Sequence, residues 1–223
     1  MAILVDADSR ICVQGITGRI GQVQARYMQQ AGTRIVSGVT PGKGGQEIED
    51  VPVYDSVGQA QAENPADVSV LFVPPPAAEG AATEAIEAGI QLVVLITEGV
   101  PVHATMRLRA RARAAGARLL GPTTPGIIAP ERTKIGIMPA QLFSRGSVGV
   151  ISRSGTLSYE MGGLLSDAGI GQSAVVGMGA DPVVGTDITE LLDLFAADPE
   201  TRVIVLIGEV GGSQEERAAR HIA

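Results

Sequence analysis

The sequence predicts an α/β protein built on a mainly parallel sheet. Short β-branched runs alternate with longer helical stretches, as in chains made of strand–helix–strand units. Apolar residues form 45% of the 223 residues, which is ample for a buried core. Only 3% are aromatic and none is Trp, so the core must consist of Val, Ile, Leu and Ala. That composition suits parallel strands covered by small-residue helices.

The first half of the chain carries five strand patterns with helices between them. Strands are expected at 10–14, 34–38, 68–73, 92–96 and 118–120, and helices at 22–31, 56–63, 77–88 and 102–115. A segment dense in Pro and Gly, "GPTTPGIIAPERTKIGIMP", then interrupts the pattern. We therefore expect a first domain at 1–122, a linker or an extended crossing at 123–145 and a second domain at 146–223.

The second domain shows a shorter version of the same alternation. Strands are expected at 147–152, 172–177 and 203–208, and helices at 154–169, 187–196 and from Ser213 onward. Three strands are few for an open α/β sheet. The sequence therefore predicts a second domain that is truncated, or one that another chain completes.

Charge and composition exclude several classes of protein. The net charge of −7 argues against nucleic-acid or anionic-membrane binding as the main task. The one concentration of positive charge, five arginines between Arg107 and Arg118, is interpreted as a solvated helix face. The single cysteine, Cys12, lies in an apolar run and reads as a small core residue in a reducing compartment. No apolar run approaches the ~20 residues of a membrane span, so we expect a cytoplasmic protein.

Three glycines follow the first predicted strand. In "RICVQGITGRIGQ" these are Gly15, Gly18 and Gly21, directly before a helix. Glycines at this spacing allow a sharp turn in which amide N–H groups and the helix N-terminus approach a phosphate. Because the pattern stands at the first strand–helix turn of an alternating chain, it predicts a nucleotide-binding loop.

The end of the second predicted strand narrows the choice of nucleotide. NAD-binding proteins place an acidic residue there for the ribose hydroxyls. Here the stretch is "GVTPGKGG", which has no acid and one lysine, Lys43. An ammonium group favours a ligand with a phosphate on or near the ribose, such as coenzyme A (CoA) or NADP.

Ordered blocks over nearly the whole chain resemble one family. They are "QGITG", "GVTPGKGG", "ITEGVP", "KIGIMP", "GVISRSGTLSYE", "GMGADPVVGTD" and "IGEVGGSQEE". The sequence is similar to the α subunits of succinyl-CoA synthetases and related acid–CoA ligases such as malate–CoA ligase. The resemblance implies a Rossmann-like CoA-binding domain followed by a flavodoxin-like α/β ligase domain, truncated here.

The resemblance also implies roles for individual residues. The residues expected to contact CoA are Thr17, Gly18, Arg19, Ile20, Lys43, Ile96, Thr97 and Glu98. Ser154, Gly155 and Thr156 begin the helix that points its N-terminus at a phosphohistidine, and Ser154 is also a plausible N-cap. Tyr159 contributes to the acid-substrate site together with a β subunit. Glu209 is expected to orient the imidazole of the phosphohistidine.

By the same resemblance the reaction passes through an acyl phosphate. ATP or GTP, held with Mg²⁺ by the β subunit of a heterodimer or heterotetramer, phosphorylates the histidine, which passes the phosphate to a small carboxylic acid. The thiol of CoA then displaces it. The family's histidine lies in a "GHAG" stretch past Ala223, and His103 and His221 both read as surface residues. A chain of these 223 residues is therefore predicted to be inactive alone.

Several positions depart from the family pattern. Thr123 and Thr124 stand where Asn and Cys are usual, Gln24 and Gln141 stand where His is usual, and Ala180 replaces a Gly. The glycine loop and Lys43 are spared, so the identity of the acid stays open. A non-catalytic CoA-binding module is the main alternative, and an NADP-dependent reductase is a further one. Continuation of the gene past Ala223 and titration with CoA and NADPH discriminate among them.

Overall fold

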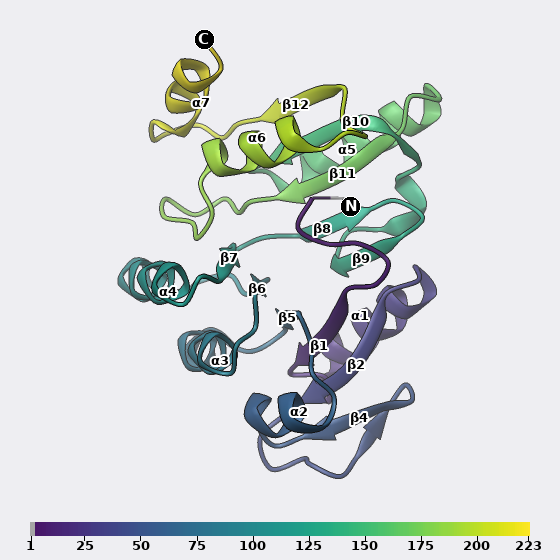
Figure 1. Ribbon diagram of the computed structural model, residues 1–223, viewed down its shortest axis with the longest axis vertical. Coiled ribbons are helices and arrows are strands. Elements are labelled where there is room, and N and C mark those ends of the chain that lie inside the picture. The colour runs from purple at the N-terminus through teal and green to yellow at the C-terminus, as the bar shows by residue number, and fades with distance from the viewer. Residues whose placement is uncertain (1–2) are drawn as a thin grey trace.

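Residues 3–223 are described by a computed structural model, whose first unit is a seven-stranded sheet (Figure 1). The strand order is β3-β4-β2-β1-β5-β6-β7, and every neighbouring pair is parallel except β3 with β4. The strands are β1 (Arg10–Gln14), β2 (Arg34–Val39), β3 (Glu47–Ile48), β4 (Val51–Tyr54), β5 (Val68–Leu71), β6 (Leu92–Leu95) and β7 (Arg118–Leu120). The prediction of a parallel α/β fold is confirmed.

Alternation along the strands divides the apolar residues between two faces. Ile11 and Val13 of β1 pack on one face, while Cys12 packs on the other, as the two-residue repeat of a strand requires. The face with Cys12 is covered by α2 (Val57–Glu63), α3 (Pro75–Glu87) and α4 (Val102–Ala114). Cys12 is fully buried, and burial raises the pKa of its thiol to about 11, which agrees with its interpretation as a core residue.

The second sheet contains five strands in the order β12-β10-β11-β8-β9. They are β8 (Gly126–Ala129), β9 (Thr133–Gly136), β10 (Arg145–Ser152), β11 (Gln172–Gly177) and β12 (Val203–Ile207). The segment 123–145, expected as a linker or an extended crossing, thus contains two strands of the sheet: β8 pairs antiparallel with β11, and β9 pairs antiparallel with β8. The glycines in this segment allow close backbone approach, because a Cβ on Gly126 would collide with Ile135 and Gly136.

Helices cover both faces of the second sheet. Besides the short 3₁₀ helix η1 (Ala140–Leu142), they are α5 (Gly155–Asp167), α6 (Ile188–Ala197) and α7 (Gln214–Ile222). In Figure 1, α6 lies in front of the sheet and α5 behind it. Within residues 3–223 no helix is both long and apolar enough to cross a bilayer.

The two units share one apolar core. The face of the first sheet that carries Ile11 packs with α1 (Arg19–Gln30) and with Ile127, Ile135 and Phe195 of the second unit. Figure 1 shows the N-terminal segment crossing this junction beside β8. Since burial of such side chains contributes about 25 cal/mol per Å² of apolar area, the units are held by a common core as well as by the chain connection.

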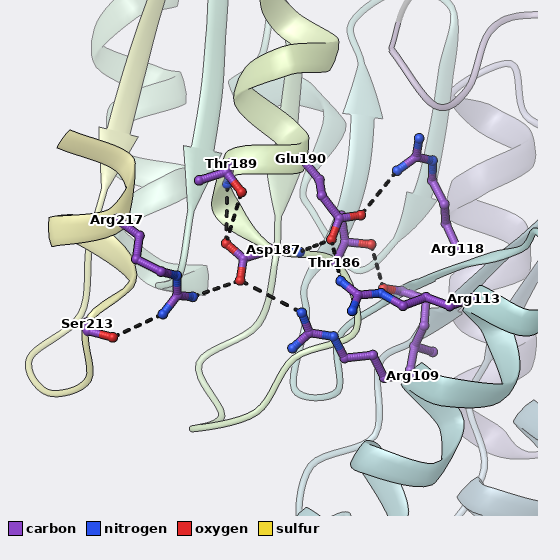
Figure 2. Close-up of polar contacts among 10 residues, drawn as sticks. Arg109, Arg113, Arg118, Thr186, Asp187, Thr189, Glu190, Ser213 and Arg217 are labelled. Atoms are coloured by element: carbon purple, nitrogen blue, oxygen red, sulfur yellow. Dashed lines mark hydrogen bonds and ion pairs between the residues drawn. The ribbon is translucent and has the colours of Figure 1, made fainter. Parts of the chain in front are cut away.

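Charged side chains also join the two units, as Figure 2 shows. Glu190 of α6 pairs with Arg113 at 2.9 Å and with Arg118 at 3.5 Å. Asp187 pairs with Arg217 at 2.7 Å and lies 3.9 Å from Arg109. The prediction of a solvated helix face holds for Arg107, Arg111 and Arg113, which are exposed, whereas Arg109 is partly buried and Arg118 lies on β7. Arg107 and Arg111 pair with α3.

Candidate functional site

A pocket of about 540 Å³ opens where the strand order of the first sheet reverses. The chain places β2 on one side of β1 and β5 on the other, so the connections after β1 and β5 run in opposite directions and leave a crevice between them. The lining comes from three connections, those after β1, β5 and β6. They contribute Gly18, Arg19, Ile20 and Gly21, then Leu71, Phe72, Val73, Pro74 and Pro75, and finally Ile96, Thr97 and Glu98.

We call this pocket the glycine-loop pocket. The glycines of the loop after β1 allow backbone segments to come into close contact. Gly15 has φ +78°, and a Cβ there would collide with the carbonyl of Phe72. A Cβ on Gly21 would collide with the carbonyl of Gly15. The N-cap of α1 is Gly18, which has no side chain, so the first-turn amides have no side-chain cap. These amides and the helix dipole favour an anion.

The structure brings most of the predicted CoA-contacting residues together. Six of the eight line the glycine-loop pocket, three from the start of α1 and three from the end of β6. Thr97 fixes the segment at the end of β6, because its hydroxyl donates to the carbonyl of Val73 at 2.7 Å. Thr17 lies beside the pocket, and its N–H donates to Thr40 Oγ1 at 3.5 Å, which joins the loops after β1 and β2.

Lys43 is not part of the pocket lining. It is exposed in the turn after β2, where its N–H donates to the carbonyl of Thr40 at 3.0 Å. The next residue, Gly44, donates its N–H to Asp55 Oδ1 at 2.8 Å. Sequence reasoning missed Asp55, since it follows β4 and reaches this turn only because β4 pairs with β2. The contact of Lys43 with a ligand stays a prediction.

A second candidate site lies at the carboxyl edge of the second sheet. Ser152 of β10 pairs with Ile207 of β12, so the segments that follow these strands lie side by side. Ser154 caps α5 by accepting from the N–H of Leu157 at 3.3 Å, and this cap leaves the amides of Gly155 and Thr156 without a side-chain partner. The helix N-terminus is thus partly exposed and suits an anion.

Glu209 follows β12 at this same edge and is exposed. Its Oε1 accepts from the N–H of Val210 at 3.1 Å. The loop that carries Glu209 is held by Arg153, a residue that sequence reasoning did not single out. Arg153 is 4% exposed, and its guanidinium donates to the carbonyl of Gly211 at 3.3 Å and to Glu215 Oε1 at 3.2 Å. A buried cation therefore fixes the carboxylate loop beside the start of α5.

Glu215 takes part in the same arrangement. Burial acts to raise the pKa of its carboxyl, but N–H donors, including that of Glu209 at 3.0 Å, together with Arg153 outweigh burial and lower the pKa. Glu215 therefore stays ionised and keeps Arg153 in place.

The other residues that the sequence singled out differ in how deeply they are buried. Tyr159 is half-buried on α5 against the apolar cluster that contains Phe143, and burial raises the pKa of its hydroxyl. Thr124 is buried, and its hydroxyl donates to the carbonyl of Gly177. Both histidines are exposed, as predicted. His103 lies in the first turn of α4, and His221 Nε2 lies 2.7 Å from Asp193 Oδ1.

Two protein families match these units. The CoA binding domain family matches residues 6–99, and the CoA-ligase family matches residues 151–223. Succinate–CoA ligase [ADP-forming] subunit alpha 2 of Archaeoglobus fulgidus is 53% identical over 222 residues, which span 100% of this chain and 77% of that protein. The chain belongs to the succinate–CoA ligase α-subunit family. The corresponding subunit of Methanothermobacter thermautotrophicus is 51% identical over 99% of this chain and 75% of its own length.

Solved structures agree on the fold. ATP citrate lyase of Methanosaeta concilii, in complex with (3S)-citryl-CoA, superposes with a TM-score of 0.85 at 25% identity over 98% of this chain and 39% of that one. A dinucleotide-forming acetyl-coenzyme A synthetase of Ca. Korarchaeum cryptofilum, in complex with phosphate and ADP, gives 0.80 at 28% identity over 96% and 48%. This chain thus spans less than half of either solved chain.

Proposed function

We propose that this chain is the CoA-positioning subunit of an acid–CoA ligase, and that CoA binds in the glycine-loop pocket. The observation that carries the proposal is the convergence of uncapped α1 amides, Arg19 and the β6 loop on one crevice at the switch point of the sheet. Its location within the matched CoA-binding region supports CoA as the ligand.

The residues of the pocket suit both the diphosphate and the adenine of CoA. The amides of the first turn of α1, with Arg19 beside them, would bind the diphosphate. Apolar residues on the opposite wall, among them Pro74 and Ile96, would contact the adenine. Glu98 would accept hydrogen bonds from amino or hydroxyl groups. Lys43, one loop away, would meet the ribose phosphate.

The second site would serve the phosphoryl group. The start of α5, at Ser154, Gly155 and Thr156, would bind phosphate, Glu209 would orient a phosphorylated imidazole, and Tyr159 would help to hold the acid. A phosphorylated acid has a good leaving group that a free carboxylate lacks, so CoA thiol attack becomes feasible. The names of the relatives, ADP-forming succinate–CoA ligase α subunits, support succinate or a similar acid as substrate and ATP rather than GTP. A β subunit would hold this nucleotide with Mg²⁺.

Calorimetry with Lys43→Ala tests the CoA site. The variant is expected to bind CoA about 1–3 kcal/mol more weakly, the size of a lost charged hydrogen bond. Dephospho-CoA, which lacks the ribose phosphate, is the matched control, because its affinity should be nearly the same for both proteins. NADPH should bind far more weakly than CoA. Equal CoA affinity in both proteins would remove Lys43 from the site, and preferential NADPH binding would refute the proposed function.

A turnover assay tests the phosphoryl relay. We expect no acid-dependent CoA ligation by the 223 residues, even with a β subunit and nucleotide present, because neither His103 nor His221 adjoins the start of α5 and Glu209. Turnover in this assay would show that the phosphate passes through another group.

A further inference from the structure

A second pocket, of about 450 Å³, lies between the two units on the far part of α1. We call it the Lys134 pocket. Helix α1 contributes Gln24, Tyr27, Gln30 and Ala31, and the segment from β9 to η1 contributes Lys134, Ile137, Pro139, Ala140 and Gln141. None of these residues lines the glycine-loop pocket, and none has a role in the proposed reaction.

Lys134 is an unusual residue for such a place. It is 2% exposed, and its Nζ lies 5.5 Å from the centroid of the Tyr27 ring. Its backbone is fixed by Thr33, whose Oγ1 accepts from Lys134 N at 3.0 Å and donates to the Lys134 carbonyl at 2.6 Å. The side chain is therefore held in the pocket by its backbone and by the aromatic ring.

The ammonium group of Lys134 has no carboxylate partner. Among the ion pairs formed within residues 3–223, none includes Lys134. Burial lowers its pKa to about 8. Lysines are rarely buried without a partner, because burial of an unpaired charge is costly. A ligand that brought a negative charge would remove this cost.

An unpaired acceptor lies in the same pocket. Gln24 Oε1 is buried and has no hydrogen-bond partner in the described part of the chain. An unsatisfied buried acceptor is costly and calls for a donor. The pocket thus lacks two groups at once: an anion for Lys134 and a hydrogen-bond donor for Gln24.

The remaining lining restricts the anion to a single charge. Lys134 is the one charged residue among the lining residues, and Gln30 and Ala31 lie at the C-terminal end of α1. A helix C-terminus carries partial negative charge, which disfavours a doubly charged phosphate. Ile137, Pro139 and the Tyr27 ring offer apolar contact to a small carbon skeleton.

We propose that the Lys134 pocket binds a small organic monocarboxylate that also carries a hydroxyl or N–H donor. The carboxylate accepts from Lys134 Nζ, and the carbon skeleton packs on Tyr27 and Ile137. The side chain of Gln24, whose Oε1 is covered in the empty pocket, rotates to accept from the donor of the ligand. This site is separate from the glycine-loop pocket, which uses the opposite end of α1.

The sequence offers a direct test, because Lys43 and Lys134 are its two lysines. Protein that carries lysine enriched in carbon-13 at Cε should give two lysine NMR signals, which the variant Lys43→Arg assigns. The probes are lactate, propionate, lactamide and inorganic phosphate. Lactate has both the carboxylate and the hydroxyl, propionate lacks the hydroxyl, and lactamide lacks the charge.

Lactate is expected to shift the Lys134 signal, to raise its titration midpoint and to leave the exposed Lys43 signal in place. Propionate should bind more weakly, and lactamide and phosphate should have no comparable effect. Gln24→Leu, at a partly exposed position that should not affect folding, is expected to lower lactate affinity about tenfold, to the level of propionate. A Lys134 signal that does not respond to lactate would overturn the proposal, as would equal binding of lactate and phosphate, or unchanged affinity in Gln24→Leu.

Discussion

Replacing Lys134 with methionine should make the protein more stable near neutral pH. The folded state lowers the pKa of Lys134 from 10.5 to about 8, because the charged form is buried without a counter-ion. Each pKa unit corresponds to about 1.4 kcal/mol, so burial of the protonated lysine costs about 3 kcal/mol. Loss of the contact with the Tyr27 ring offsets about 1 kcal/mol. The expected net gain for Lys134→Met is therefore about 2 kcal/mol.

The pH dependence of this gain is its most specific feature. Between about pH 8 and pH 10.5 the unfolded chain binds the lysine proton more tightly than the folded protein, so the stability of the native protein rises with pH over that range. The advantage of Lys134→Met should be full near pH 7 and should disappear by about pH 10.5.

Urea unfolding of both proteins at several pH values measures the effect. The control is Lys43→Met, at an exposed lysine, which should change the free energy of unfolding by less than about 0.5 kcal/mol at any of these pH values. Destabilisation by Lys134→Met at neutral pH, or a gain that is independent of pH, would refute the reasoning that Lys134 is a buried, unpaired cation.

Two other substitutions test the loop and the contact between the units. Gly21→Ala puts a Cβ against the carbonyl of Gly15 and should lower CoA affinity about tenfold or more. The control Gly80→Ala, in open space on α3, should leave CoA affinity unchanged. Calorimetry with CoA compares the two variants. Asp187→Asn leaves two arginines without their partner and should cost about 1–2 kcal/mol in urea unfolding. Burial acts to raise the pKa of Asp187, but its Thr189 and arginine partners lower it below its usual value. The difference from the native protein should therefore begin to shrink as pH falls below about 4 and vanish once pH has fallen through the lowered pKa of the folded protein.

The buried parallel strands could be predicted because their residue types leave few alternatives. Runs such as "VVL" in β6 are buried on both faces, and their β-branched residues suit a strand. The β8–β9 pair was missed because Pro and Gly usually end strands, whereas here Gly126 and Gly136 allow two backbones to touch. β3 and β4 were missed because β3 has two residues and Pro52 lies within β4.

The site followed from the sequence only where its residues directly follow strands. The starts of α1 and α5 and the end of β6 are placed by the sheet itself. The resemblance singled out Arg19 and Thr97 at such places, and the capping pattern also singled out Ser154. Lys43 lies in an exposed turn, and no periodicity fixes where such a side chain points.

Contacts between distant segments could not be predicted from local patterns. Lys134 meets Tyr27 only because α1 packs against β9. Gln24 and Gln141 both depart from the family's usual histidine, and they line the same pocket although 116 intervening residues separate them in the sequence. Arg153 reads as an ordinary loop residue, yet it is buried and holds the loop of Glu209.

A crystal structure of this chain with CoA tests the central claim most directly. The account predicts the diphosphate on the amides that begin α1, beside Arg19, with the rest of the cofactor extending along the loop after β6. Clear density for CoA in another cleft, with the glycine-loop pocket left empty, would contradict it.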